Sequence, residues 1–261
     1  MFQANKLYVC GHRGAKAVKP ENTMSSFLYA AENGVGMIET DVHMSADKKL
    51  MLIHDESLDR TTDKTGLVRE LTFDEIRLAD AGNGEKVPTL EELLEGTKHV
   101  EGLIYNIELK DYIEVVGEEF ALECVDLVLE LIEKYGLTER VIINSFSSDL
   151  LAYVHNKFPK KYAMHGFYPY YHMFGKADPE EFLTNATVYN SVLGEDGKPQ
   201  MCADPLAPFE VYSGLFEKGI VPWLPSSARD PAFVITLLGR GVRVVTSNHP
   251  VALSRALGLV Y

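Results

Sequence analysis

Short apolar runs, separated by longer stretches of helical spacing, make up most of the chain. Runs of about four to eight residues between glycine, proline and charge predict buried strands. Between them, apolar residues recur every three or four positions, as after Thr23, which predicts amphipathic helices. Strands are expected at residues 7–10, 35–42, 50–53, 103–110, 141–144, 161–165, 200–203, 220–224 and 242–246. Helices are expected at residues 23–33, 73–78, 114–134, 149–157, 209–216, 231–238 and 251–257, with another after 88–89.

The alternation of strand and helix predicts a parallel sheet covered by helices. The chain has 261 residues, and a TIM (β/α)8 barrel needs about 250, so we expect one such domain over residues 1–261. Nine strand candidates are one more than the barrel needs, and residues 200–203 are the expected surplus. A small polar insertion on the carboxyl rim is expected at residues 55–84, and an irregular, aromatic-rich rim loop at 166–200.

The composition is that of an ordinary globular protein, with 46% hydrophobic and 24% charged residues. The net charge of −13 argues against a nucleic-acid surface, which needs basic stripes. No apolar run approaches the length of a membrane span, so stable membrane insertion is not expected. A negative protein still accommodates a phosphate substrate where a bound metal reverses the local charge.

Three cysteines, Cys10, Cys124 and Cys202, lack the spacing of a metal site and are odd in number. This usage predicts a reducing compartment. The chain enters its first expected strand almost at once, without the apolar segment of a signal peptide. We therefore expect a cytoplasmic protein, and the pattern leaves a homodimer open.

Two carboxylates, Glu39 and Asp41, are one residue apart on the second expected strand, so both lie on the same face. Glu108 lies on one face of the fourth expected strand. Carboxylates directed into a barrel are costly unless a cation holds them. Three oxygen ligands with open positions are typical of Mg²⁺ or Ca²⁺. The alternative is a structural ion network with Arg13 or Lys110.

Two histidines, His12 and His54, end two of the expected strands. If those strands are parallel, both histidines reach the rim where barrels of this kind build active sites. Paired imidazoles serve as general acid and base near neutral pH, and the sequence does not assign which is which. Arg13 and Lys110 could hold a phosphate, the first through paired hydrogen bonds and the second as a point charge. Together these groups fit phosphodiester cleavage better than acyl or hydride transfer.

Short motifs surround these residues, most of them within about the first 110 positions. They are His12-Arg13-Gly14, Pro20-Glu21-Asn22-Thr23, Ile38-Glu39-Thr40-Asp41-Val42, His54-Asp55 with Leu58-Asp59-Arg60-Thr61-Thr62, and Ile107-Glu108-Leu109-Lys110, with Pro88-Thr89-Leu90-Glu91-Glu92 and Ser145-Phe146 in addition. In kind and in order they resemble the motifs of the glycerophosphodiester phosphodiesterase family. One such motif would be weak evidence, whereas five in order are strong.

The resemblance implies a TIM barrel that hydrolyses glycerophosphodiesters to sn-glycerol 3-phosphate and an alcohol. It implies His12 and His54 as acid and base, and phosphate contacts from Arg13 and Lys110. The metal ligands that it implies are Glu39, Asp41 and Glu108, with Mg²⁺ or Ca²⁺ as the cofactor. The glycerol hydroxyl beside the phosphoester would attack first and water would open the cyclic phosphate, which agrees with the lack of a Ser or Cys nucleophile motif.

The carboxyl-terminal third departs from the family pattern. Members usually carry Trp-Thr-Val-Asn on the seventh strand, where this chain has Trp223-Leu224-Pro225-Ser226. The last strand usually ends in Thr-Asp-x-Pro, where this chain has Thr246-Ser247-Asn248-His249-Pro250. We expect neither departure to touch the metal and histidine set, and both to bear on the alcohol side of the substrate. Trp223 is expected to wall the glycerol carbons or to be plain core.

Several alternatives stay open. Glu21, Asn22, Asp55 and Arg60 are expected to brace loops rather than to catalyse. The run 167–174 is either a lid over a bulky headgroup or acyl chain, or loop packing on the barrel. The proposed reaction has rivals in a lysophospholipase D or cyclising phosphodiester lyase on the same barrel. A catalytically silent barrel that binds a phosphodiester is the rival outside enzymes.

Overall fold

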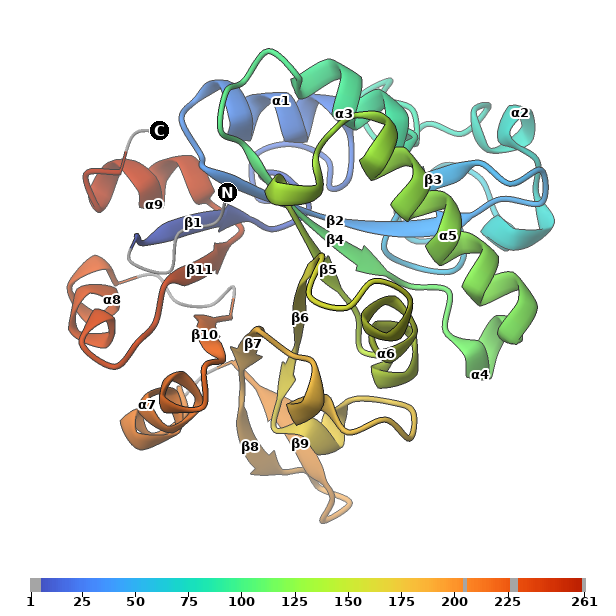
Figure 1. Ribbon diagram of the computed structural model, residues 1–261. Helices are drawn as coiled ribbons and strands as arrows, with labels where there is room; N and C mark the ends of the chain where they lie inside the picture. The colour runs from blue at the N-terminus through green and yellow to red at the C-terminus, as the bar shows by residue number, and fades with distance from the viewer. Residues whose placement is uncertain (1–5, 204–205, 226–229, 260–261) are drawn as a thin grey trace.

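Eight parallel strands close into a barrel in the part of the chain that the structure describes, residues 6–203, 206–225 and 230–259. In this computed structural model, pairing of β1 with both β2 and β11 completes the ring. Helices lie outside it (Figure 1), which is the TIM-barrel fold expected from the sequence. The barrel strands are β1 (Tyr8–Gly11), β2 (Met37–Met44), β4 (Ile104–Leu109), β5 (Val141–Asn144), β6 (Ala163–Tyr168), β7 (Asn185–Val188), β10 (Val221–Leu224) and β11 (Val244–Ser247).

Several helices begin at capping residues that the sequence places before them. Thr23 accepts a hydrogen bond from the backbone of the first turn of α1, and Thr89 forms a capping box with Glu92 at α3. Among the described residues, none of the helices combines the length and the apolar character that crossing a bilayer requires. The helices around the barrel are α1 (Met24–Glu32), α3 (Leu90–Thr97), α4 (Ile113–Val116), α5 (Glu118–Lys134), α6 (Ser148–Lys157), α7 (Phe209–Glu217), α8 (Pro231–Leu238) and α9 (Pro250–Ala256).

The helix expected at 114–134 is two helices. Gly117 separates α4 from α5 with φ of +84° and ψ of +156°. This conformation is nearly restricted to glycine, so the helix cannot continue through it. The apolar spacing on both sides is helical, which is why the periodicity alone did not show the break.

The third expected strand does not belong to the barrel. β3 (Leu50–Leu52) pairs antiparallel with β2, Met44 opposite Leu50. β2 is eight residues long, and a turn at Asp47-Lys48 sends the chain back along its edge. A connection this short joins only antiparallel strands. The condition that the strands before His12 and His54 are parallel is therefore not met. His54 still reaches the carboxyl rim, because β3 starts beside the end of β2 and runs back toward the level of Asp41.

Residues 55–84 form the insertion expected on the rim. It contains the short helices η1 (Val68–Glu70) and α2 (Phe73–Ile76). A small core of its own holds it to β3 through Met51 and Ile53. The insertion projects beside β3 (Figure 1).

One barrel strand lies inside the stretch expected to be irregular. β7 pairs in parallel with β6 and β10, and β6 itself runs on to Tyr168, beyond the predicted end at 165. Asn-Ala-Thr-Val in β7 is too short and polar to show as an apolar run. Residues 200–203, the expected surplus, do lie outside the barrel, in β9 (Pro199–Cys202), which pairs with β8 (Asn190–Leu193), but β3 is a second strand outside it and β7 takes its place.

The barrel interior changes from apolar to polar along its axis. An apolar layer fills the lower part, where inward side chains of six strands meet. Polar side chains replace it toward the carboxyl ends, where Asn106, Asn144 and Thr187 are buried. The apolar layer consists of Tyr8, Cys10, Met37, Ile104, Ile142, Val221, Trp223 and Val244.

Candidate active site

A cavity of about 210 Å³ opens at the carboxyl end of the barrel. It contains six of the residues predicted for the site, which the fold brings from β2, β4 and the segments that follow β1 and β3. Trp223 is not in its lining, and Lys110 borders it through contacts described below. The lining residues are His12, Arg13, Glu39, Asp41, His54, Asn106, Glu108, Asn144, Phe146, His165, Phe167, Thr187, Tyr189, Pro225 and Thr246.

Three carboxylates meet on one side of this cavity. Oxygens of Glu39, Asp41 and Glu108 lie within 4.8 Å of one another, because the parallel register sets Asp41 opposite Glu108. All three residues are buried, and Asp41 Oδ1 has no hydrogen-bond partner. Crowded anionic oxygens with an unfilled acceptor fit a divalent cation with a preference for oxygen, such as Mg²⁺ or Ca²⁺.

Burial and nearby charges also shift the pKa values of two of the carboxyl groups, Glu39 and Asp41. Burial, with the charges of Asp41 and Glu108, raises the pKa of Glu39 well above its ordinary value. Burial acts in the same direction on Asp41, but nearby cations, Lys110 foremost, lower the pKa of Asp41 overall. Without a cation, Glu39 is therefore the group that favours a proton, and a cation bound at this cluster would displace it.

The loop after β1 is shaped around this cluster. Arg13 and Gly14 adopt left-handed φ of +50° and +81°, and the Arg13 N–H donates to Glu39 Oε2 at 2.7 Å. A Cβ at Gly14 would collide with the first turns of α1, so the close approach requires glycine. Asn22, expected only to brace the loop, donates from Nδ2 to Asp41 Oδ2 at 2.8 Å and so orients that carboxylate.

Two cations border the carboxylates. Arg13 Nη1 lies 2.7 Å from Glu21 Oε1, and Arg13 Nε lies 3.5 Å from Asp41 Oδ2. Lys110 Nζ lies 3.1 Å from Glu108 Oε1 and 3.7 Å from Asp41 Oδ1. Because Glu21 takes part of the charge of Arg13, these two cations leave the three carboxylates incompletely neutralised.

His12 is fixed by an amide. Its Nδ1 lies 2.7 Å from Asn248 Oδ1, so Nδ1 carries the proton and Nε2 keeps its lone pair. Burial, then the charges of Arg13 and Lys16, lowers the pKa of His12 to about 4. The difference from the family pattern after the last strand, which includes Asn248, was expected not to touch the histidines. This expectation was wrong, because the loop after β11 folds over the end of β1. Ser226, the other departure, lies outside the described residues.

His54 is fixed by a carboxylate. Its Nδ1 lies 2.6 Å from Asp55 Oδ1, and Arg60 Nε donates to Asp55 Oδ2 at 2.5 Å. This hydrogen bond from Arg60 is the main cause that lowers the pKa of Asp55. Arg60 also reaches Glu21 Oε1 at 2.7 Å, and Lys110 Nζ approaches His54 Nε2 at 3.2 Å. The bracing role expected for Asp55 and Arg60 therefore acts on His54.

The opposite wall of the cavity is aromatic. Phe146 and Phe167 stack with ring centroids 3.6 Å apart, and Tyr189 lies beside Phe167 at 6.3 Å. Burial, then the charge of Glu108, raises the pKa of Tyr189 to about 12, so its hydroxyl stays protonated. Tyr189 was missed because it follows β7, the strand that the pattern did not reveal.

The rest of the aromatic run stays out of the cavity. Tyr170 packs between two parts of the outer core, and Tyr171 is 61% exposed. Tyr171 contacts Ser191 on the hairpin β8–β9. Only Phe167 from this run lines the cavity, so most of the run packs on the barrel.

Trp223 lies below the cavity, not in its wall. It is fully buried, donates from Nε1 to Asn185 Oδ1 at 3.1 Å and stacks on His165 with centroids 4.0 Å apart. His165 separates it from the carboxylates and contributes to the cavity floor. Of the two expectations for Trp223, this placement matches plain core.

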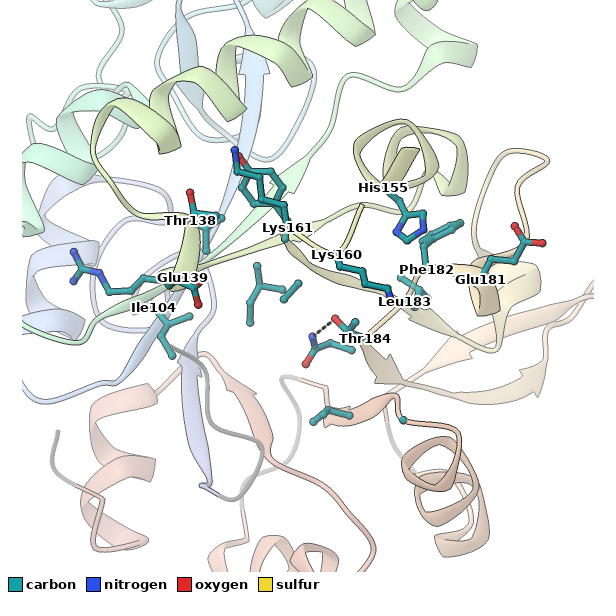
Figure 2. A pocket seen from close by; sticks show the side chains of 18 residues that line it. Ile104, Thr138, Glu139, His155, Lys160, Lys161, Glu181, Phe182, Leu183 and Thr184 are labelled. Atoms are coloured by element: carbon teal, nitrogen blue, oxygen red, sulfur yellow. Dashed lines mark hydrogen bonds between the residues drawn. The ribbon is translucent and has the colours of Figure 1, made fainter. Parts of the chain in front are cut away.

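A larger cavity, of about 560 Å³, lies at the other end of the barrel. Its lining includes His155, Lys160 and Lys161, and none of the predicted site residues (Figure 2). It opens where β5, β6 and β10 begin. Barrels of this fold carry their chemistry at the carboxyl end, so the smaller cavity is the candidate active site.

Comparisons with known proteins agree with the motifs. A relative from Bacillus altitudinis, named glycerophosphodiester phosphodiesterase, is 37% identical over 159 residues, which are 58% of this chain and 62% of that protein. The chain thus matches about three fifths of the length of this relative.

Solved structures match nearly the whole fold. Glycerophosphodiester phosphodiesterase from Thermotoga maritima has a TM-score of 0.69 at 26% identity, covering 96% of this chain and 98% of that one. A phosphodiesterase from Oleispira antarctica, solved with the product sn-glycerol-3-phosphate, has a TM-score of 0.77 at 22% identity and covers 96% of both chains. The model of the glycerophosphoryl diester phosphodiesterase family matches residues 12–197. The chain belongs to this family.

Proposed function

We propose that the protein hydrolyses glycerophosphodiesters to sn-glycerol 3-phosphate and an alcohol, with Mg²⁺ or Ca²⁺ held by Glu39, Asp41 and Glu108. The observation that carries the proposal is one cavity in which His12 and His54 face this carboxylate cluster. The product bound to the Oleispira antarctica structure and the name of the Bacillus altitudinis relative support the same reaction class.

The residues around the cluster would bind the phosphate. When bound, the cation would supply positive charge to the phosphoryl oxygens. Arg13 and Lys110 border the same place and would add charge-assisted hydrogen bonds. Tyr189, with its hydroxyl protonated, is a further donor at the cavity wall.

Two proton transfers complete the proposed reaction. His12 takes the proton of the glycerol hydroxyl next to the phosphoester, whose oxygen then bonds to phosphorus. The bond from phosphorus to the alcohol oxygen breaks, and His54 gives that oxygen a proton. Water opens the resulting cyclic phosphate with the two histidines in reversed roles. The substrate supplies the nucleophile, and none of the described cavity residues is a Ser or Cys.

The partners of the histidines support this assignment of base and acid. Burial, then the charges of Arg13 and Lys16, lowers the pKa of His12 and keeps the ring neutral, and the Asn248 oxygen holds Nδ1 so that Nε2 is ready to accept a proton. Asp55 holds the His54 ring through Nδ1. With His12 as the base, His54 is left as the acid of the proposed reaction.

The test is an assay of the purified protein on glycerophosphocholine, with glycerol 3-phosphate detected under Mg²⁺, Ca²⁺ or EDTA. We expect metal-dependent release that falls at least about a hundredfold in His12→Ala and Glu39→Ala, and stays unchanged in the surface control His99→Ala. A cyclic phosphate that accumulates would favour the lyase. Release from lysophosphatidylcholine alone would favour the lysophospholipase D, and no product from either substrate would favour the silent barrel.

A further inference from the structure

His43 and Asp111 form a buried hydrogen-bonded pair beside the candidate active site. His43 lies near the end of β2 and Asp111 follows β4, and they are 4% and 3% exposed. His43 Nδ1 lies 2.6 Å from Asp111 Oδ1. Asp111 Oδ2 accepts the Met44 N–H at 2.7 Å. Neither residue lines the cavity, and the proposed reaction does not use either one.

The pair reaches His54 through the backbone. His43 Nε2 lies 3.4 Å from the His54 carbonyl oxygen. Both ring nitrogens of His43 therefore lie beside oxygen atoms, one of Asp111 and one of the His54 backbone. Replacing both members of a buried hydrogen-bonded pair by apolar groups of the same shape is often nearly neutral, so fold stability alone is a weak reason for the pair.

The backbone of His54 depends on contacts of this kind because His54 lies outside the barrel strands. It follows β3, a strand of three residues at the end of the sheet, whereas the three carboxylates lie on barrel strands and His12 directly follows one. Lys110, the neighbour of Asp111, touches the His54 ring at Nε2. Two successive residues after β4 thus reach residue 54, one at its side chain and one, through His43, at its backbone.

We propose that His43 and Asp111 are positioning residues that set the place of His54 relative to the carboxylate cluster. The inference rests on the proposed function, in which His54 transfers a proton. Proton transfer requires a donor within hydrogen-bond reach, and a misplacement of about 1 Å costs up to about a hundredfold in rate.

The kinetic test replaces the pair without leaving a buried charge. His43→Phe/Asp111→Asn keeps the ring volume and an acceptor for the Met44 N–H, but removes the link to His54. We expect kcat to fall about tenfold or more with KM within about twofold. In a His54→Ala background the same double change should leave kcat unaltered, because the group it positions is gone.

A matched control removes another buried polar contact far from the site. Thr97 and Tyr105 share a buried hydrogen bond of 2.8 Å between α3 and β4. Thr97→Val should lower the unfolding midpoint and leave kcat unchanged. A loss of kcat in Thr97→Val as large as in His43→Phe/Asp111→Asn would mean that general loosening of the barrel explains both, and would overturn the proposal.

A second readout does not depend on activity. In metal-free protein labelled with ¹⁵N-histidine, the signals that disappear in His54→Ala identify His54. We expect these signals to shift or to double in His43→Phe/Asp111→Asn and to stay in place in Thr97→Val. Unchanged His54 signals would overturn the positioning role. Shifted signals in a protein that releases no product would keep that role and reject the proposed reaction.

Discussion

At the scale of single residues, the two histidines differ most in what holds Nδ1. Asn248 at His12 is uncharged, and Asp55 at His54 is a carboxylate tied to Arg60. The same ring thus meets two electrostatic environments about one cavity. A single substitution can make the two environments alike.

Asn248→Asp should change the pH profile. A carboxylate in hydrogen-bond contact favours imidazolium and should raise the pKa of His12 from about 4. As the pH falls, His12 of the variant then becomes protonated at a higher pH than in the wild type. The acidic limb of the kcat/KM profile should therefore move upward by about one pH unit or more, with little change in kcat/KM near pH 8. The control Asn156→Asp adds the same charge on the exposed face of α6. An acidic limb that stays in place, or that moves equally in the control, would contradict His12 as the base.

His165→Gln should alter how stability depends on pH. Burial lowers the pKa of His165 to about 3, against an ordinary value of 6.5. Between these values the unfolded chain binds the extra proton, so stability is lost as pH falls below about 6.5. Between pH 7 and pH 5 the free energy of unfolding of the wild type should fall by about 2 kcal/mol more than that of His165→Gln.

Urea unfolding of metal-free protein measures this difference. The surface change His99→Gln is the control, and it should follow the wild type at every pH. Equal losses in the wild type and in His165→Gln would show that this histidine is not held neutral by burial.

Single positions were predicted best where chemistry and spacing coincide. Glu39 and Asp41 alternate on one strand, so their meeting with Glu108 needed only the strand assignment. Asn248 and Tyr189 could not be found in this way, because each lies on a loop whose path depends on tertiary packing. A lone amide or tyrosine carries no periodic signal.

At the scale of elements, turn length and strand composition decided what the pattern revealed. Asp47-Lys48 is a visible turn, and its shortness already implies an antiparallel return, so the orientation of β3 was accessible from the sequence. β7 was not accessible, because the buried Asn185 and Thr187, which hydrogen-bond to Trp223 and His165, interrupt the apolar run.

Substitutions at two glycines test whether backbone conformation causes the break between α4 and α5. Gly117→Ala should lower the free energy of unfolding by about 1–3 kcal/mol. The φ of +84° at this position disfavours any side chain, although no other atom lies close enough to clash with the new Cβ. Gly214→Ala, inside α7 and also in open space, should stabilise by about 0.5–1 kcal/mol. Urea unfolding measures both, and opposite signs are the expected result. The same sign in both would show that backbone conformation does not govern the break between α4 and α5.

At the scale of the whole molecule, a cation bound at the carboxylate cluster would couple its binding to folding. Three carboxylates from β2 and β4 are held within 4.8 Å, and their repulsion is a cost that only the folded chain bears. A cation that binds the folded chain at 100 times its Kd adds about 2.7 kcal/mol of stability. For a chain of this size, that raises Tm by roughly 5–10 °C. Calorimetry in Mg²⁺, Ca²⁺ and EDTA measures the shift.

Glu39→Gln separates a cation site from a structural ion network. If the cluster holds a cation, the variant loses the Tm shift, and without metal it is more stable than the wild type because it no longer bears the cost of charging or protonating Glu39 among the other carboxylates. If instead the carboxylates serve to pair Arg13 and Lys110, removing one charge leaves these cations under-compensated, and the metal-free variant is less stable. Glu101→Gln, on the exposed surface, controls for net charge and should keep the shift. Because the sign of the metal-free difference depends only on which interaction dominates the cluster, it decides between the two interpretations even before any substrate is known.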